Sequence, residues 1–140
     1  MAKKVFVSFD WDNDKRYKFL MQAWHSNPNF DFIFDDRSSK EINSWDIPTV
    51  RAALTRKINT ADYTLVIVGK EANHFHTDHK AIGSRNWLNF EIKQSKMNQN
   101  KLIGVKLNRL NDSPEELLGS NTSWAMSFTQ ESIIQALNNA

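Results

Sequence analysis

Residues 63–69 read Tyr63-Thr64-Leu65-Val66-Ile67-Val68-Gly69, a run that is apolar over almost its whole length. A strand with one solvated face alternates between apolar and polar residues, whereas a strand covered by helices on both faces is apolar almost throughout. The run is therefore typical of a central strand in a parallel sheet. A fold built around such a strand places helices on both faces of the sheet.

Strand and helix patterns alternate on both sides of this run. Short apolar runs predict further strands at 5–9, 30–34 and 102–107, and a short edge strand at 124–128. Apolar residues at helical spacing predict helices over 14–24, 48–61, 87–97 and 129–138. Strands joined by helical crossovers run parallel. We predict an α/β fold of the flavodoxin-like kind, a three-layer sandwich in which residues 1–140 form one domain around a five-stranded parallel sheet of order 2-1-3-4-5.

Composition excludes several classes of protein. The chain has 140 residues, of which 40% are hydrophobic, and no apolar run approaches the length needed to cross a bilayer. It has no cysteine, which excludes disulfides, thiolate zinc sites and cysteine nucleophiles. The N-terminus carries no secretory signal, so we expect a cytoplasmic protein that does not bind membranes. The net charge is +2 with scattered Lys and Arg, so we expect no nucleic-acid partner.

Ligands of such a sheet bind outside the carboxyl ends of the strands, beside the point where strands one and three diverge. That places the site at the loop after Phe9 and the segment after Gly69. The first loop carries Asp10, Asp12 and Asp14 and no glycine, whereas a flavin-binding loop cradles phosphate with hydroxyl and glycine residues. Repulsion between carboxylates and phosphate argues against flavin.

Phosphoryl and metal chemistry also lack residues that they need. A phosphorelay receiver needs an aspartate at the end of strand three, where this chain has Val68-Gly69-Lys70; a receiver-like module that is not phosphorylated stays open. The run from Asp10 resembles a calcium loop but has Lys15 in place of the required glycine. Three imidazoles lie within 74–79, in a segment that we interpret as a solvated loop over the site, and we expect no metal.

The predicted helix at 87–97 holds the most informative pair. Trp87 and Glu91 are four residues apart and therefore project from the same face of the helix. Spacing alone is equally compatible with a core aromatic residue beside a surface carboxylate.

Two segments together carry a family resemblance. The chain opens with Lys4-Val5-Phe6-Val7-Ser8-Phe9, and the later helix carries Ser84-Arg85-Asn86-Trp87-Leu88-Asn89-Phe90-Glu91. These segments and the order of elements resemble TIR domains, and look most like the TIR-like proteins of the bacterial Thoeris antiphage system. TIR domains open with an apolar-apolar-Ser-aromatic strand and carry Ser-x-Trp-x-x-x-Glu on the later helix; here Ser84 lies one residue farther from Trp87.

The resemblance implies a function and a site. In TIR domains that cleave NAD this glutamate is catalytic, so Glu91 is the expected catalytic residue, with NAD as substrate and no cofactor. The expected substrate-binding residues are Ser8, Phe9, Asp10, Asp36, Trp45 and Trp87.

Both hydrolysis and closure of a cyclic ADP-ribose-type signal remain open, as do the partners: self-association or a phage-derived trigger, and a downstream effector that senses the nucleotide. The alternative is a TIR-like or receiver-like module that signals without catalysis, by protein-protein association.

Overall fold

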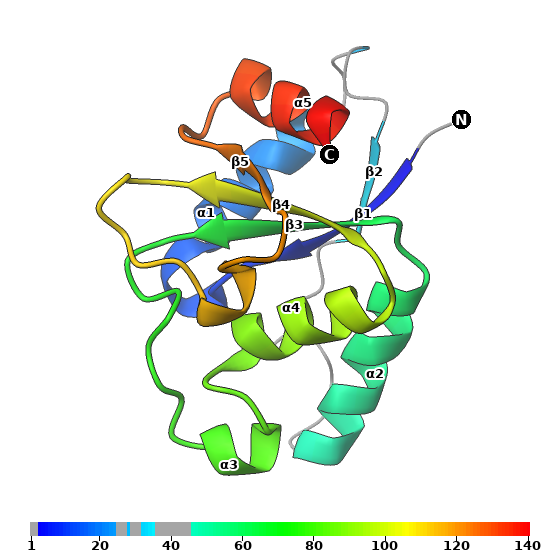
Figure 1. The fold of residues 1–140 in the computed structure, drawn as a ribbon, viewed down its shortest axis with the longest axis vertical. Coiled ribbons are helices and arrows are strands. Elements are labelled where there is room, and N and C mark those ends of the chain that lie inside the picture. Colours follow the sequence, from blue (N-terminus) through cyan, green and yellow to red (C-terminus); the bar gives the residue numbers. More distant parts are fainter. Residues whose placement is uncertain (1–2, 25–27, 29–31, 36–45) are drawn as a thin grey trace.

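The structure is a computed structural model, and it describes residues 3–24, 28, 32–35 and 46–140 (Figure 1). Five strands form one sheet: β1 (Lys3–Ser8), β2 (Phe32–Asp35), β3 (Tyr63–Val68), β4 (Lys101–Lys106) and β5 (Ser123–Ala125). All neighbouring strands are parallel, and their order across the sheet is β2-β1-β3-β4-β5. The predicted α/β fold with a parallel sheet is confirmed.

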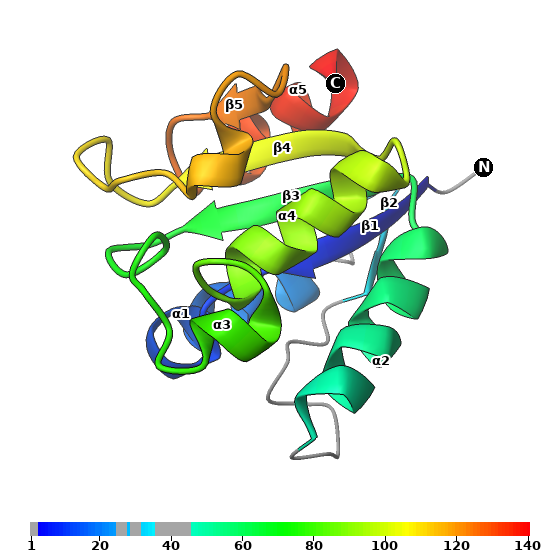
Figure 2. The same ribbon diagram turned by 60° about the horizontal axis from the view of Figure 1, so that its bottom comes forward.

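Helices cover both faces of this sheet (Figures 1 and 2). Their bounds are α1 (Trp11–Ala23), α2 (Ile47–Asn59), α3 (His79–Ile82), α4 (Trp87–Met97), the 3-10 turn η3 (Glu115–Leu117) and α5 (Gln130–Asn139). α1 and α5 lie on one face, and α2 and α4 lie on the other.

The central strand explains this layering. All six side chains of β3 are buried, and they alternate between two layers of the core. Leu65 and Ile67 pack with residues of α1 and α5, whereas Val66 and Val68 pack with residues of α4. The continuous apolar run therefore reflects burial on both faces, as expected for a strand between two helical layers.

Most element bounds lie close to their predictions. α4 covers the predicted residues 87–97, and α5 and β4 begin within one residue of theirs. α1 begins at Trp11, three residues before the predicted start, because the Asp10 side chain accepts a hydrogen bond from the Asp12 amide and caps the helix there. The short α3 was not predicted, since four residues are too few to show a helical period.

No helix within the described ranges is long and apolar enough to cross a membrane.

Candidate functional site

A cleft of about 360 Å³ opens at the carboxyl edge of the sheet, beside the ends of β1 and β3. It is lined by residues 9–13, by Glu71 and residues 74–76, and by residues 86–88. These segments follow β1, follow β3, and begin α4, so the topology of the sheet brings them together (Figure 2). The cleft lies where the sequence predicted the site.

The Ser8 hydroxyl and the Glu91 carboxyl meet next to this cleft. The Ser8 hydroxyl donates a hydrogen bond to Glu91, with Oγ 3.3 Å from Oε1 and 3.5 Å from Oε2. Both side chains are buried, and Glu91 is only 1% exposed. Trp87, one turn earlier on α4, lines the cleft, but Ser8 and Glu91 lie beneath it. A pocket lined by Ser8, Trp87 and Glu91 together would favour an enzyme, and of these three residues only Trp87 lines the cleft.

Burial determines the charge of Glu91. Removal of the carboxyl from water raises the pKa of Glu91 well above 4.5, and the hydrogen bond from Ser8 opposes that rise only in part. The protonated form is therefore favoured in this structure. A carboxylate generated here would be cut off from water, which screens charge far better than a protein interior does.

In the acidic loop after β1, the carboxylate of Asp10 has a structural role. Asp10 lines the cleft, but its Oδ1 accepts from the Asp12 amide at 3.1 Å and its Oδ2 accepts from Asn13 Nδ2 at 2.7 Å. These bonds cap the first turn of α1. The carboxylate of Asp10 therefore faces the cleft as a group already hydrogen-bonded on both oxygens.

Asp14 lies behind this loop and was not predicted to be buried. It is 6% exposed, and its Oδ2 has no hydrogen-bond partner within the described residues. The carboxyl packs against the end of β3 so closely that a Cβ atom on Gly69 would lie 2.0 Å from Oδ2. Burial first, and the nearby Asp10 second, raise the pKa of Asp14 from 3.8 to about 6, and Arg16 opposes them.

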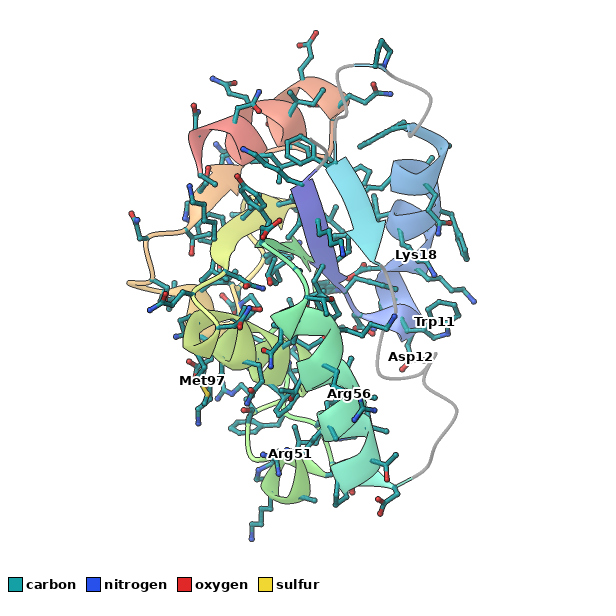
Figure 3. The ribbon with its side chains drawn as sticks, turned by 90° about the vertical axis from the view of Figure 1, so that its right-hand side faces the viewer. Trp11, Asp12, Lys18, Arg51, Arg56 and Met97 are labelled. Carbon is teal, nitrogen blue, oxygen red and sulfur yellow. The ribbon has the colours of Figure 1, made fainter. Side chains whose placement is uncertain are left out.

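Aromatic side chains form much of the cleft wall. Phe9 is buried at the end of β1 with its ring 6.1 Å from that of Trp11, and Trp87 packs edge-on against Phe90 at 5.6 Å. Trp11 packs against the core beside Phe9 and also lines the cleft, because the early start of α1 places it there. The Lys18 ammonium lies 5.3 Å from the Trp11 ring, on the same helix (Figure 3).

The family match agrees with this geometry. A model of the TIR-like domain of Thoeris protein ThsB matches residues 6–112, which include Ser8, the cleft and Glu91. The chain belongs to the ThsB TIR-like family. Membership of the ThsB family places the chain in the context of Thoeris antiphage defence. A search of curated proteins finds no match to it.

One residue of this ThsB-type site was missed at the sequence level. Asn86 caps α4 by accepting from the Asn89 amide at 2.9 Å, and its Nδ2 donates to the carbonyls of Ala72 and His74, each at 2.9 Å. It ties the loop after β3 to the helix that carries Trp87 and Glu91. An asparagine directly before a predicted helix is the signal of a cap that could have identified it.

The histidines of the cleft wall are engaged with their own loop. His74 pairs with Glu71, and His76 Nδ1 accepts from the Asp78 amide at 2.9 Å. Among the residues that the structure describes, no three His, Asp or Glu side chains converge as metal ligands would. Asp36 and Trp45, both predicted to bind substrate, lie outside the described residues.

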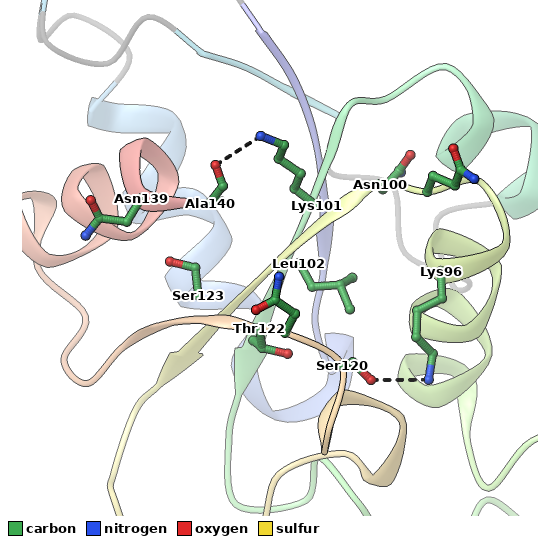
Figure 4. A pocket seen from close by; sticks show the side chains of 11 residues that line it. Lys96, Asn100, Lys101, Leu102, Ser120, Thr122, Ser123, Asn139 and Ala140 are labelled. Atoms are coloured by element: carbon green, nitrogen blue, oxygen red, sulfur yellow. Dashed lines mark hydrogen bonds between the residues drawn. The ribbon is translucent and has the colours of Figure 1, made fainter.

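A larger groove of about 520 Å³ lies at the opposite edge of the sheet, where β4 and β5 begin (Figure 4). Its two lysines are engaged: Lys96 Nζ contacts Ser120 Oγ at 3.4 Å, and Lys101 Nζ donates to the Ala140 carbonyl at 3.1 Å. Of the residues that the structure describes, none with an aromatic side chain lines this groove. Its polar groups stabilise the ends of elements, so the candidate site of the ThsB-type domain is the cleft at the carboxyl edge.

Proposed function

We propose that this chain is a single TIR-like domain that cleaves NAD between nicotinamide and ribose, as a signal-producing enzyme of antiphage defence. One observation carries the proposal. The glutamate at the family's catalytic position, Glu91, is held by Ser8 at the end of β1, directly beside an aromatic cleft at the carboxyl edge of a parallel sheet. That is the edge at which sheets of this topology bind ligands.

The reaction suits a single carboxylate. When the glycosidic bond breaks, its electron pair passes to the pyridinium nitrogen, so nicotinamide leaves as a neutral molecule and needs no acid to protonate it. Glycosidases, whose leaving groups need protonation, use two carboxyl groups. An ionised Glu91 would stabilise the positive charge that develops on the ribose, and this interaction is stronger in the transition state than in the ground state.

The surroundings of Glu91 support that role. Burial, which raises the pKa of Glu91, also strengthens every electrostatic interaction that the ionised form makes, and Ser8 supplies a hydrogen bond that opposes the rise and favours that form. Phe9, Trp11 and Trp87 provide flat faces on which the pyridinium ring can stack. The protein therefore contributes orientation and a poorly hydrated site for the charge.

The fate of the cation determines the product. Water would give ADP-ribose, with loss of a proton, whereas a nucleophilic atom of the same ADP-ribose would close a cyclic molecule and also lose a proton. A cleft that excludes water favours ring closure. We place the reaction in the cytoplasm, with self-association or a phage-derived protein as the trigger and an effector that senses the product.

The test measures NAD turnover by the Glu91→Gln variant, with release of nicotinamide as the readout. We expect loss of turnover with the fold retained, because glutamine keeps the size of the neutral side chain and lacks the charge. Glu131→Gln, which alters an exposed carboxylate on α5, is the matched control and should turn over NAD as the wild type does. Normal turnover by Glu91→Gln, in a preparation in which the wild type is active, would show the mechanism to be wrong.

A second function, signalling by association without catalysis, is favoured by one observation. Glu91 is 1% exposed and lies beneath the cleft, so no substrate atom reaches it in this structure. In that case the cleft is an interaction surface, and Glu91→Gln would still signal in a phage-protection assay.

A further inference from the structure

Phe75 is an exposed aromatic residue at the edge of the cleft. Its side chain is 65% exposed although it lines a cavity that three other aromatic residues also line. An apolar ring left in water at the edge of a cleft retains free energy that a ligand can recover by covering it.

The ring is held in place from one side. The Arg85 guanidinium lies over it, with Cζ 4.0 Å from the ring centroid, and the edge of His79 contacts it at 5.3 Å. Glu115 Oε2 lies 3.9 Å from Arg85 Nε, close enough for an ion pair. Cation–π contact on one face leaves the other face of the phenyl ring available for a second stacking partner.

The loop that carries Phe75 is anchored at both ends. The His76 amide donates to the Arg85 carbonyl at 2.9 Å, which closes the loop on itself. Asn86 bonds the carbonyls of Ala72 and His74, one on each side of residue 73. A ring positioned in advance in this way loses little conformational entropy when a ligand stacks on it.

We propose that Phe75 is the stacking platform for the purine base of the dinucleotide. The assignment rests on the proposed function, which brings the nicotinamide end of NAD toward Glu91. Phe9 and Trp87 flank that end, since Phe9 follows Ser8 and Trp87 lies one turn before Glu91. Phe75 lines the same cleft from the loop after β3, and its 65% exposed ring lies at the surface of the cleft. Phe75 can therefore stack on the adenine ring of the same ligand.

The test compares ligands that carry only one of the two rings. Binding of ADP-ribose, which keeps adenine, and of nicotinamide mononucleotide, which lacks it, is measured by calorimetry in Glu91→Gln so that nothing is turned over. We expect Phe75→Ala to weaken the binding of ADP-ribose by roughly 5- to 150-fold, the range for one base stacked on one aromatic side chain, and to leave the binding of nicotinamide mononucleotide unchanged. Phe75→Tyr should restore the affinity.

Leu110→Ala is the matched control, because Leu110 is an exposed apolar residue (83%) outside the cleft. It should change neither affinity. Equal weakening of both ligands, unchanged binding of ADP-ribose, or no binding of ADP-ribose by the parent would each overturn the assignment. The proposed function is judged separately, by nicotinamide release from the wild type, so a protein that cleaves NAD normally can still refute the role of Phe75.

Discussion

Single buried carboxyl groups dominate the chemistry of this sheet edge. Glu91 and Asp14 are both nearly inaccessible to water, and burial is the main cause of the raised pKa of each. The folded protein therefore binds these protons more tightly than the unfolded chain does. The stability that each group contributes is fully present below its unfolded pKa and is lost as pH rises through its folded pKa.

Asp14 makes this effect measurable near neutral pH. Its pKa rises from 3.8 to about 6 through burial and through Asp10 and Glu71, with Arg16 opposing. We expect the free energy of unfolding of the wild type, relative to Asp14→Asn, to fall by up to about 3 kcal/mol between about pH 3.5 and pH 7. Urea unfolding of both proteins across this range measures the difference.

Two results bear on that prediction. Asp112→Asn, which changes an exposed aspartate in the loop after β4, should follow the wild type at every pH. A stability difference between wild type and Asp14→Asn that does not change with pH would contradict the argument, whatever its size. The constant part of the difference reports the packing of the new amide and does not enter the comparison.

The connection between the loop after β3 and α4 depends on one side chain. Asn86→Ser keeps an oxygen that can cap α4 but removes both donors to the loop carbonyls of Ala72 and His74. The buried carbonyl of Ala72 and the partly buried carbonyl of His74 then lack this partner, so we expect a loss of roughly 1–3 kcal/mol of stability. Hydrogen exchange should show loss of protection at the His76 amide.

A matched variant separates the effect of losing a helix cap from the effect of losing the hydrogen bonds to the loop. Thr129 caps α5, a different helix, because its hydroxyl accepts a hydrogen bond from the Ser132 amide at 3.2 Å. Thr129→Ala removes this cap. It should lower stability by about 1 kcal/mol without changing exchange at His76. If Asn86→Ser leaves the protection of His76 intact, the loop is held by other contacts.

The elements themselves were largely predictable from local pattern. β3 and α4 follow from an apolar run and from helical spacing, because burial on two faces and burial on one stripe leave different periods in a sequence. The start of α1 was not, because it depends on whether Asp10 folds back onto the Asp12 amide. An Asp side chain can bond the backbone in a loop or at the start of a helix, and residue type alone does not decide which of the two forms.

At the scale of the whole molecule, the location of the cleft was predictable and its internal geometry was not. The ends of β1 and β3 had to meet because the sheet is parallel, and this brought Ser8 to Glu91 across 83 positions of sequence. Spacing placed Trp87 and Glu91 on one face of α4, but it could not show that the cleft stops above Glu91. The depth of a cavity depends on how residues of several elements pack together. The roles of Phe75 and Asn86 in this packing cannot be predicted from the local sequence pattern.

This burial leads to a prediction about the assembled protein. Glu91 is 1% exposed, so the proposed reaction requires the protein to open before substrate reaches this carboxyl, and opening costs free energy that binding to another protein can offset. If self-association stabilises the open form, NAD turnover per molecule should rise with protein concentration and approach a plateau. Nicotinamide release measures this turnover over a roughly hundredfold range of protein concentration, within which the associated fraction changes most.

The same titration with Glu91→Gln should show no turnover at any concentration, which excludes a contaminant whose amount rises with the protein. Turnover per molecule that is high and constant over the whole range would show that the isolated chain opens by itself. Turnover that stays absent until a phage protein is added, and then depends on Glu91, would assign the opening to that partner instead. Where a partner is needed, it lowers the barrier set by burial of Glu91, because burial covers this carboxyl and raises its pKa in the closed form, whereas the hydrogen bond from Ser8 opposes that rise.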